Sequence, residues 1–496
     1  MSQSATISEA TRAFLSEKHG PYIDGKWVNG TGDPIDCINP ASGQVFAKVN
    51  CASTADTESA IVAARRSFDV GTWRSKTPAE RAKTLWKIAD LIEENAILLA
   101  ELETLDGGKL FSAALNGEVA MAAESFRYYA GWVTKLEGKT ARISSAGKIP
   151  FHCYSEYHPV GVVGAITPWN GALVMAAWKL APAMAAGCSA VLKPSEQTNL
   201  STLVLGKLIE QAGVPAGVVN IVPGSGNDVG SVIANSLLVD KISFTGSTVT
   251  GKKLVEAAKG NLKKLTLELG GKSPAIVLSD ADLDRAVPGI AGGIFSNAGQ
   301  VCVAGSRLYV DHRIHDVFLK RLVDHTSKIK VGDGFLQSSE MGPVISEGHL
   351  NNIQRFVSDA VKSGAKIACG GQKMDTAGFY FPPTILTNVD DSMQIAREEV
   401  FGPVLVVQPF ENLNDVISRA NNSDYGLAAS VWTQDIGKAH SLIRKLEAGI
   451  TWVNAHGIPD MAMPFGGFKQ SGWGREGGLE GLLQYCELRS TLVNLA

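Results

Sequence analysis

Two short segments of this 496-residue chain carry side chains that together could make and break a covalent bond. Cys302 lies in F-S-N-A-G-Q-V-C-V, and Glu268 lies in T-L-E-L-G-G-K-S-P. A cysteine thiol can attack a carbonyl carbon and hold it as a covalent adduct. A carboxylate can then activate the water molecule that releases the adduct. Glycines near both residues suit a tight site where backbone comes close to a ligand.

Residue types alone leave several chemistries open. The chain has seven cysteines, and a cysteine is more often a small buried hydrophobe than a nucleophile. A thiol hydrolase would need a histidine partner, and His152, His158 and His456 are available for that role. In isolation, Glu268 fits best as a salt-bridging residue at the end of a strand. A thiol hydrolase with a Cys–His pair and a non-catalytic binding or structural protein are therefore both compatible with these residues.

The composition is that of a soluble globular protein, with 45% hydrophobic and 19% charged residues. A chain of this length is expected to form two or three domains. The net charge of -3 and the pI near 6.3 give no electrostatic reason to expect nucleic acid or an anionic membrane as a partner. The cysteines lack paired or metal-like spacing, so we expect no bound metal, no disulfide framework and a reducing compartment.

No targeting segment is indicated. The start, M-S-Q-S-A-T-I-S-E-A, lacks the basic and apolar regions of a secretory signal. The most apolar segment, 172–192, contains Lys179 and Pro182 near its middle, which favours a buried core helix over a membrane span. We therefore expect a cytoplasmic location.

Strands alternate with helices along most of the chain, which predicts parallel sheets covered by helices on both faces. Helical patterns occupy 78–114, the segment from about Leu173, 200–212, the segment through Ala258 and the segment from about Asp282. Strand patterns occupy 157–166, 189–193, 218–222, 241–245, 265–269, 273–278 and 307–310. The rhythm restarts after Gly271, which we interpret as the boundary between two α/β domains. The C-terminal 487–496 is predicted to be a strand that pairs with a distant strand or with another subunit.

Three segments could bind a nucleotide. P-G-S-G-N-D-V-G (223–230) has an extra residue compared with the dinucleotide fingerprint, so an ordinary glycine-rich turn is at least as good an interpretation. F-T-G-S-T-V-T-G (244–251) places a turn before a helix whose free N–H groups could bind a pyrophosphate, or could simply be capped by Ser247. L-K-P-S-E (192–196) ends a strand, where Lys193 and Glu196 could bind ribose hydroxyls or form a solvated pair.

Eight segments, in the same order along the chain, resemble motifs of the aldehyde dehydrogenase superfamily. They are T-P-W-N, K-P-S-E, F-T-G-S-T, L-E-L-G-G-K, G-Q-V-C, E-E-V-F-G-P-V, Y-G-L-A-A-S-V-W and P-F-G-G-F-K-Q-S-G-W-G-R-E. The resemblance extends from about Tyr22 to the C-terminus and is closest to the NAD-dependent branch that hydrolyses its thioester. The segment H-G-I-P-D-M-A-M-P-F-G-G is similar to phenylacetaldehyde and related aryl aldehyde enzymes.

The resemblance implies an α/β fold with a Rossmann-like cofactor domain, an α/β catalytic domain and a small β oligomerisation element. We expect the cofactor domain to comprise 1–139 and 159–270, and the catalytic domain to comprise 271–470. The oligomerisation element would combine 140–158 with 480–496. The family habit implies a homodimer or a homotetramer.

The resemblance also implies a role for each catalytic residue. Cys302 would attack the aldehyde to give a thiohemiacetal, with the Asn170 side chain and the Cys302 N–H as oxyanion donors. Glu268 would activate water against the thioester, and Lys179 and Glu476 would form a polar pair that relays protons behind it. Acylating relatives that use coenzyme A usually lack a glutamate at this position, so Glu268 favours a free acid as product. A coenzyme A-acylating dehydrogenase is the alternative.

NAD is the implied cofactor. Glu399 would contact the ribose next to the nicotinamide, and Phe401 would pack near the nicotinamide itself. Lys193 and Glu196 would contact the adenosine ribose, where the carboxylate of Glu196 would repel a 2'-phosphate and so favour NAD over NADP. The other expected cofactor residues are Ile166, Thr167, Trp169, Gly226, Gly246 and Ser247.

The expected substrate pocket is mostly apolar or aromatic, which suits an apolar or aryl aldehyde. His456 stands where choline-type aldehyde enzymes have a tryptophan of their aromatic cage, which lowers that option, and the absence of arginine weighs against semialdehydes with a second carboxylate. For Trp178, core packing is about as good an interpretation as pocket lining, and Asn454 looks structural. The expected wall is Gly171, Val174, Trp178, Phe295, Val301, Val303 and Phe465, with a rim at 456–460.

Overall fold

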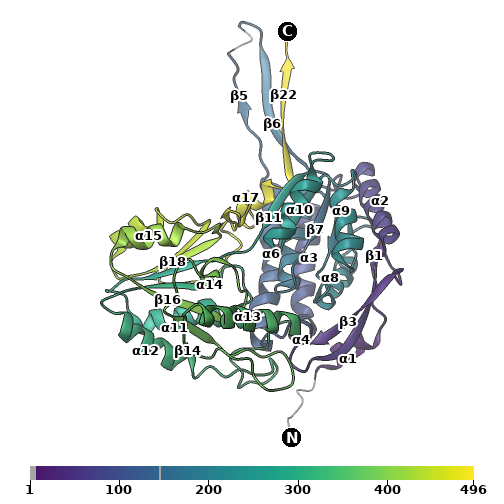
Figure 1. Cartoon of the computed structure of the whole chain (residues 1–496). Coiled ribbons are helices and arrows are strands. Elements are labelled where there is room, and N and C mark those ends of the chain that lie inside the picture. The colour runs from purple at the N-terminus through teal and green to yellow at the C-terminus, as the bar shows by residue number, and fades with distance from the viewer. Residues whose placement is uncertain (1–6, 145–146) are drawn as a thin grey trace.

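The computed structural model describes residues 7–144 and 147–496. Two short stretches lie outside the described residues: 1–6 and 145–146. The first belongs to the N-terminal segment that was examined for a secretory signal, and the second lies inside the predicted oligomerisation element. Two large sheets with helices packed on them form two lobes, and a thin three-stranded arm projects from the body (Figure 1). The α/β fold predicted from the sequence is therefore confirmed.

The first sheet has eight strands, and its five central strands run parallel. Strands β1, β2 and β21 pair antiparallel at its two edges. The fully buried β7 and β8 read as nearly continuous apolar runs, as expected where helices cover both faces. The order is β2 (Lys26–Trp27), β1 (Tyr22–Ile23), β9 (Val219–Ile221), β8 (Ser189–Lys193), β7 (Val162–Ile166), β10 (Lys241–Thr245), β11 (Lys264–Glu268) and β21 (Gly472–Trp473).

The second sheet has seven strands, and only its edge strand β14 runs antiparallel. The chain changes from the first sheet to the second between β11 and β12, across Gly271. The order is β14 (Lys366–Cys369), β15 (Thr384–Thr387), β16 (Val404–Phe410), β13 (Arg307–Asp311), β12 (Pro274–Val277), β18 (Ala428–Trp432) and β19 (Ile450–Val453).

The projecting arm brings two distant segments together (Figure 1). Its strands are β5 (Thr140–Ala141), β6 (Phe151–Pro159) and β22 (Cys486–Asn494), and β22 pairs antiparallel with β6 from Cys486↔Pro159 to Asn494↔Phe151. The prediction that the C-terminal strand pairs with a distant strand is thus confirmed. Two further pairs join β3 (Gly32–Asn39) to β4 (Gln44–Cys51) and β17 (Tyr425–Gly426) to β20 (Phe468–Lys469).

The helical segment predicted over 78–114 is divided in the structure. Asn95 leaves the helical region at φ -106° and ψ 20°, and Gly108 adopts a left-handed φ of 73°. The first half of the fold contains α1 (Glu9–Ser16), α2 (Thr54–Val70), α3 (Pro78–Glu94), α4 (Ala96–Gly107), α5 (Phe111–Ala113), η1 (Ala114–Val119), α6 (Ala120–Trp132), η2 (Val133–Lys135), α7 (Ala172–Ala186), α8 (Leu200–Gln211), η3 (Gly226–Gly230), α9 (Ser231–Asn235) and α10 (Thr248–Ala258).

The remaining helices mostly accompany the second sheet. They are α11 (Leu283–Phe295), η4 (Ser296–Gly299), α12 (His315–Thr326), α13 (Glu347–Lys362), α14 (Gln394–Arg397), α15 (Leu413–Asn421), α16 (Ile436–Ile443) and α17 (Gly478–Leu483). Helix α7 is buried over almost its whole length, as predicted for the apolar segment that holds Lys179. Among the helices of the described residues, none combines the length and the apolar character that crossing a bilayer requires.

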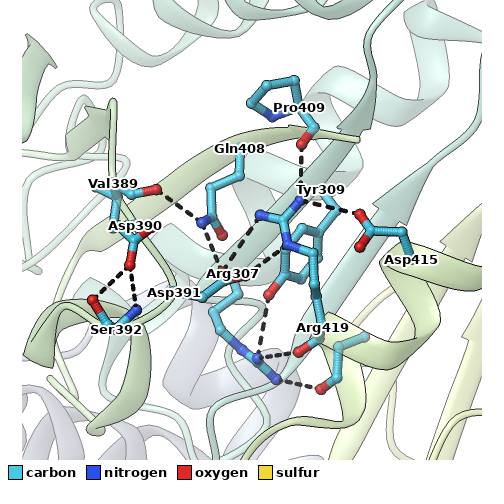
Figure 2. Close-up of polar contacts among 11 residues, drawn as sticks. Arg307, Tyr309, Val389, Asp390, Asp391, Ser392, Gln408, Pro409, Asp415 and Arg419 are labelled. Carbon is cyan, nitrogen blue, oxygen red and sulfur yellow. Dashed lines mark hydrogen bonds and ion pairs between the residues drawn. The ribbon is translucent and has the colours of Figure 1, made fainter. Parts of the chain in front are cut away.

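A polar network fixes α15 to the second sheet (Figure 2). Arg307 on β13 donates to the carbonyl oxygen of Ala420 at 2.8 Å. Arg419 on α15 donates to Asp391 at 2.6 Å, and Asp391 also accepts from Gln408 on β16 at 2.8 Å. A buried charge is costly without partners, so these contacts make the position of α15 specific. The same sheet supports the loop that carries Cys302.

Candidate functional site

One cavity of about 980 Å³ collects nearly all of the predicted site residues. It lies at the carboxyl ends of β7, β8, β10 and β11, where open α/β sheets bind ligands. The predicted residues that line it are Ile166, Thr167, Trp169, Asn170, Gly171, Val174, Trp178, Lys193, Glu196, Gly226, Gly246, Ser247, Glu268, Val301, Cys302, Val303, Glu399, Phe401, Phe465 and Glu476.

Two predicted site residues lie away from this cavity. Phe295, at the end of α11, packs in the core of the second sheet with 3% of its surface exposed, and it is not part of the wall. The side that a residue faces at a helix end depends on where the helix stops, which the sequence pattern does not fix. Lys179 is fully buried behind the wall, where it contacts Glu476.

The loop that carries Cys302 has an unusual backbone. Asn297, Ala298 and Gly299 all adopt left-handed φ angles, of 48°, 53° and 72°. Such a run is costly for residues with side chains and persists only where surrounding contacts determine it. Gln300 supplies such contacts, because its fully buried side chain donates to the Asn297 carbonyl at 3.0 Å and accepts from the Ile345 N–H at 2.8 Å.

Asn170 is tied to the same loop. It follows β7 and precedes α7, and its side-chain Nδ2 donates to the carbonyl oxygen of Gln300 at 2.9 Å. An asparagine amide has two N–H donors, so the second is available to a ligand in the cavity. The contact joins the first sheet to the nucleophile loop of the second.

The thiol of Cys302 is neutral in this environment. Burial raises its pKa to about 12, and the nearby carboxylates of Glu399 and Glu268 act in the same direction. The N–H groups of Val303 and Cys302 oppose this rise. Because only the thiolate is strongly nucleophilic, the proton must be removed when substrate arrives.

Glu268, the last residue of β11, is a buried carboxyl group without a hydrogen bond from the described residues to either oxygen. Burial and the neighbouring Glu476 hold its pKa well above the usual range, against the opposing charges of Lys179 and Arg475. Buried carboxyl groups normally have partners, so an unpartnered one at a cavity wall is suited to act on a ligand or a water molecule. A raised pKa also suits a general base near neutral pH.

A buried ion pair lies behind Glu268. Lys179 on α7 contacts Glu476, and both side chains are almost completely buried. The ammonium of Lys179 also donates to Thr245 at 2.7 Å and to Ser243 at 3.4 Å. Ser243 in turn accepts from the hydroxyl of Tyr485 at 3.2 Å. The pair predicted for Lys179 and Glu476 is thus present as a contact, within a larger network that sequence reasoning missed.

The cofactor residues lie at the ends of β8 and β10. Lys193 and Glu196 form an ion pair of 3.3 Å, and burial lowers the pKa of the Lys193 ammonium. Helix α10 begins at Thr248 with Ser247 as its cap, so its first N–H groups point towards the cavity side of Gly246. A carboxylate and an ammonium at one strand end, next to a helix N-terminus, match the ribose hydroxyls and the phosphates of a dinucleotide. These residues therefore fit NAD.

Glu399 and Phe401, from the second half of the chain, also line the cavity. Glu399 accepts from the N–H of Gly271 at 2.9 Å, and burial raises its pKa to about 7. Phe401 has a left-handed φ of 56° and packs edge-on against Trp169 with 5.3 Å between ring centres. His349, which sequence reasoning missed, bonds to the Phe401 carbonyl at 2.8 Å and also lines the cavity.

The apolar wall follows one face of α7. Gly171, Val174 and Trp178 lie on it at helical spacing, and Trp178 packs edge-on against Phe465 at 5.3 Å. The cavity lining of Trp178 agrees with the pocket interpretation, although its side chain is also buried. Met175 lies on the same face and was missed, although the spacing of three and four residues identifies it.

The rim predicted over 456–460 is only partly present. Gly457 and Pro459 line the cavity, but the half-buried His456 lies behind Val303 and bonds to its carbonyl oxygen at 2.7 Å. Trp452, another lining residue that was missed, lies in the same W-V-N segment as Asn454. Asn454 pairs through its side chain with both backbone groups of Thr433, as a structural residue would.

The described residues contain no group of three or more His, Cys, Asp or Glu side chains placed to hold a metal ion. All seven cysteines are free thiols, and only Cys302 and Cys369 are partly exposed.

The comparisons with known proteins cover almost the whole chain. The protein-family model described as "Aldehyde dehydrogenase family" matches residues 27–491 of this chain. "Putative aldehyde dehydrogenase DhaS" of Bacillus subtilis (strain 168) is 45% identical over 490 residues, 99% of this chain and 98% of that protein. "Retinal dehydrogenase 2" of Homo sapiens is 44% identical over 477 residues, 96% of this chain and 91% of that protein. The "NAD+ complex structure of aldehyde dehydrogenase from bacillus cereus" has a TM-score of 0.97 at 45% identity, covering 99% of this chain and 100% of that chain.

Proposed function

This chain belongs to the aldehyde dehydrogenase family, and we propose that it oxidises an apolar or aryl aldehyde to the carboxylic acid with NAD, through a covalent bond to Cys302. One observation carries the proposal. Cys302, Asn170 and the unpartnered carboxyl group of Glu268 line a single cavity together with a Lys193–Glu196 pair suited to a ribose. The proposed nucleophile, oxyanion donor, base and cofactor site therefore line the same cavity.

In the first step, the sulfur of Cys302 bonds to the carbonyl carbon of the aldehyde. The carbonyl oxygen becomes negative, and the free N–H of Asn170 and the Cys302 N–H donate to it. Donors fixed in advance stabilise such charge because they need not reorganise. Because the pKa of the thiol is high, its proton is released to solvent as the C–S bond forms.

NAD, when bound, supplies the acceptor for the hydride lost from the former aldehyde carbon. The protein must then hydrolyse the remaining thioester on Cys302. Glu268 removes a proton from water, the water oxygen attacks the thioester carbon, and the sulfur leaves. The charges of the neighbouring Lys179–Glu476 pair set how readily Glu268 takes up and releases that proton.

Glu196 supports NAD over NADP. Its carboxylate lies 3.3 Å from the Lys193 ammonium and lines the cavity. A 2'-phosphate on the ribose would meet this negative charge, whereas a free diol can donate hydrogen bonds to it. The relative from Bacillus cereus, whose solved structure contains NAD+, supports the same choice.

The substrate preference rests on the wall of the cavity. Val174, Trp178, Phe465 and Trp452 contribute apolar or aromatic surface, and the lining of the described residues includes no arginine. The lysine on the substrate side, Lys109, is already paired with Glu103 and Glu118. An aldehyde with an apolar or aryl body, such as phenylacetaldehyde, therefore fits better than one with a second carboxylate.

The decisive experiment measures both products. Purified enzyme is incubated with NAD and a panel of aliphatic, aryl and charged aldehydes, with and without coenzyme A. We expect NADH and free acid in equal amounts, with the highest kcat/KM for aryl aldehydes. A coenzyme A thioester as product would instead support the acylating alternative. Ester hydrolysis without any NADH formation would support the thiol hydrolase.

Cys302→Ser tests the nucleophile, and Cys369→Ser, at the other partly exposed cysteine, is its matched control. We expect loss of NADH formation and of any trapped acyl adduct only in the Cys302 variant. Full activity of Cys302→Ser would refute the covalent mechanism.

We further propose that 140–158 and 480–496 form an oligomerisation element and that the enzyme is a cytoplasmic homodimer or homotetramer. The domains would be 1–139 with 159–270, and 271–470. Within the described residues, only one edge of β22 is paired, and Leu488 and Leu492 are exposed beside it. Free thiols suit a reducing compartment. Light scattering of the full chain, compared with a Leu488→Lys variant, measures the assembly.

A further inference from the structure

We propose that His456 is a positioning residue that holds the nucleophile loop in its reactive conformation by binding the backbone of Val303. The inference rests on the proposed role of Cys302 as the nucleophile. His456 follows β19, far from Val303 in sequence, and its ring lies directly behind the loop. The contact links the second sheet to the residue that follows the thiol.

Both ring nitrogens of His456 have defined partners. Nε2 lies 2.7 Å from the Val303 carbonyl oxygen, and Nδ1 lies 2.9 Å from Ser430 Oγ on β18. A carbonyl can only accept, so Nε2 carries the proton and Nδ1 accepts from the serine hydroxyl. Trp432 Nε1 donates to the same hydroxyl at 3.3 Å. These hydrogen bonds favour the neutral tautomer that carries its proton on Nε2, and this N–H donates to the Val303 carbonyl.

Two glycines make room for the ring on either side of the nucleophile. A methyl group at Gly293 would lie 3.0 Å from Cδ2 of the imidazole, and one at Gly305 would lie 3.1 Å from Cε1. Gly293 belongs to α11, which leads into the loop, and Gly305 follows the loop. The N–H of Gly305 also donates to the Gly293 carbonyl at 3.1 Å. The imidazole therefore contacts the chain both before and after Cys302.

Val303 connects the imidazole to the thiol. Its carbonyl accepts from His456, while its N–H lies near the Cys302 sulfur and lowers the pKa of the thiol. The two groups flank one Cα, so a contact that fixes the carbonyl also restricts the N–H. A thiolate gains from a fixed N–H donor. Loss of the His456 contact should therefore reduce the reactivity of the sulfur without removing it.

The imidazole performs this task as a neutral group. Burial lowers its pKa, and the hydrogen bond to Val303 opposes that effect. Its neighbours include the two glycines, Ser430, the Val303 carbonyl and the aromatic ring of Trp452 at 5.1 Å, and none of these is charged. A neutral donor can hold a carbonyl without placing a fixed charge behind the nucleophile.

Three substitutions separate hydrogen bonding from packing. His456→Gln retains an amide N–H that can reach Val303, whereas His456→Phe fills the space without a donor. His440→Phe changes an exposed histidine in the last turn of α16 and serves as the control. The measurements are the rate constant for alkylation of Cys302 by iodoacetamide, followed by mass spectrometry, together with kcat/KM, the KM for NAD and Tm.

We expect His456→Phe to lower alkylation and kcat/KM by about 10- to 100-fold, because small displacements of a reacting group have effects of this size. The KM for NAD should not change, and His456→Gln should recover most of both rates. Wild-type alkylation in His456→Phe would overturn the inference. Equal losses in the Gln and Phe variants that simply follow Tm would also overturn it, since they would indicate packing alone.

A second variant keeps the test decisive if His456→Phe does not fold. Ser430→Ala leaves the imidazole but removes the donor to Nδ1, so we expect alkylation to fall by about 2- to 10-fold, the effect of one hydrogen bond. Unchanged alkylation there would overturn the inference. Activity that persists in Cys302→Ser would refute the proposed function itself, whereas an inactive Cys302→Ser with a normal His456→Phe would refute only the role of His456.

Discussion

The side chain of Asn170 donates to the backbone carbonyl of Gln300 across 2.9 Å, and this bond joins the two lobes at the nucleophile. Asn170 follows the central strand β7 of the first sheet, whereas Gln300 precedes Cys302 by two positions in a loop of the second half. The bond uses one N–H of the amide and leaves the other without a contact among the described residues, while Asn170 lines the cavity. The position of the Asn170 amide, the proposed oxyanion donor, therefore depends on how the two lobes meet.

Asn170→Ala should lower kcat/KM by about 100- to 1,000-fold, because it removes a donor to the developing oxyanion. Stopped-flow measurement of the first burst of NADH isolates the step in which that charge forms. Asn422→Ala, at an exposed position after α15, is the control and should leave the burst unchanged. A normal burst in Asn170→Ala would show that the oxyanion is stabilised elsewhere.

Glu268→Gln should retain the burst of NADH but slow steady-state turnover by about 100-fold or more, since a base typically contributes this much. The acyl group should then accumulate on Cys302 and be visible by mass spectrometry of the intact protein. Glu256→Gln, exposed on α10, provides a matched control. Steady-state turnover at the wild-type rate would remove Glu268 from the hydrolytic step.

The same substitution should stabilise the fold at higher pH. The folded pKa of Glu268 is raised well above 4.5, its usual value, so the folded state holds this proton more tightly than the unfolded state. Stability from this group is therefore present at low pH and declines as pH rises from 4.5 towards the folded pKa. Glutamine has no such dependence.

Urea unfolding of both proteins at about pH 5 and about pH 8 measures this difference, worth about 1.4 kcal/mol for each unit of pKa shift. We expect the advantage of Glu268→Gln to be larger at the higher pH. A difference that is independent of pH would mean that the carboxyl group is ionised in the folded state throughout.

Charges behind Glu268 should shift the pH profile of turnover in opposite directions. Glu476 raises the pKa of Glu268 and Lys179 lowers it. Glu476→Gln should therefore move the rise of the hydrolytic rate to lower pH, and Lys179→Met should move it to higher pH. Acid-quench kinetics of thioester loss across the pH range record both shifts. Shifts of the same sign would exclude a direct electrostatic effect on Glu268.

Glu196→Ser should relax the preference for NAD, because it removes the carboxylate that would repel a 2'-phosphate. We expect kcat/KM with NADP to rise relative to NAD by about 10-fold or more, the effect of about 1.4 kcal/mol. Glu94→Ser, exposed at the end of α3, should leave the ratio unchanged. An unaltered ratio in Glu196→Ser would place the adenosine ribose elsewhere.

Sequence patterns predicted part of the fold because apolar runs and glycine turns are local signals. The predicted elements include the five central strands of the first sheet, strands β12, β13 and β22, and helices α3, α4, α7, α8, α10 and α11. The prediction of one continuous helical segment over 78–114 was wrong, because Asn95 and Gly108 depart from helical backbone angles. The predicted residues that line the cavity lie in motifs that stay together along the chain. Phe295 was the exception, because its orientation depends on where α11 ends.

Most of the network behind the site could not be predicted, since its members are distant in sequence, and the Lys179–Glu476 pair was expected only from the family resemblance. Lys179 and Glu476 are separated by 297 positions, and Tyr485 and Ser243 by 242. His456, expected at the cavity rim, instead contacts the Val303 carbonyl for the same reason. No local pattern states which way a side chain points once its loop packs between two strands.

The short strand β21 pairs with β11 opposite Glu268, after the chain has already completed the second sheet. Synthesis on a ribosome proceeds from the N-terminus, so Cys302 and Glu268 emerge well before Gly472 and Glu476 can join them. A nascent or truncated polypeptide therefore contains Cys302 before the cavity lining that includes Glu476 is complete. The surroundings of Glu268 are therefore complete only after the end of the chain has folded back onto β11.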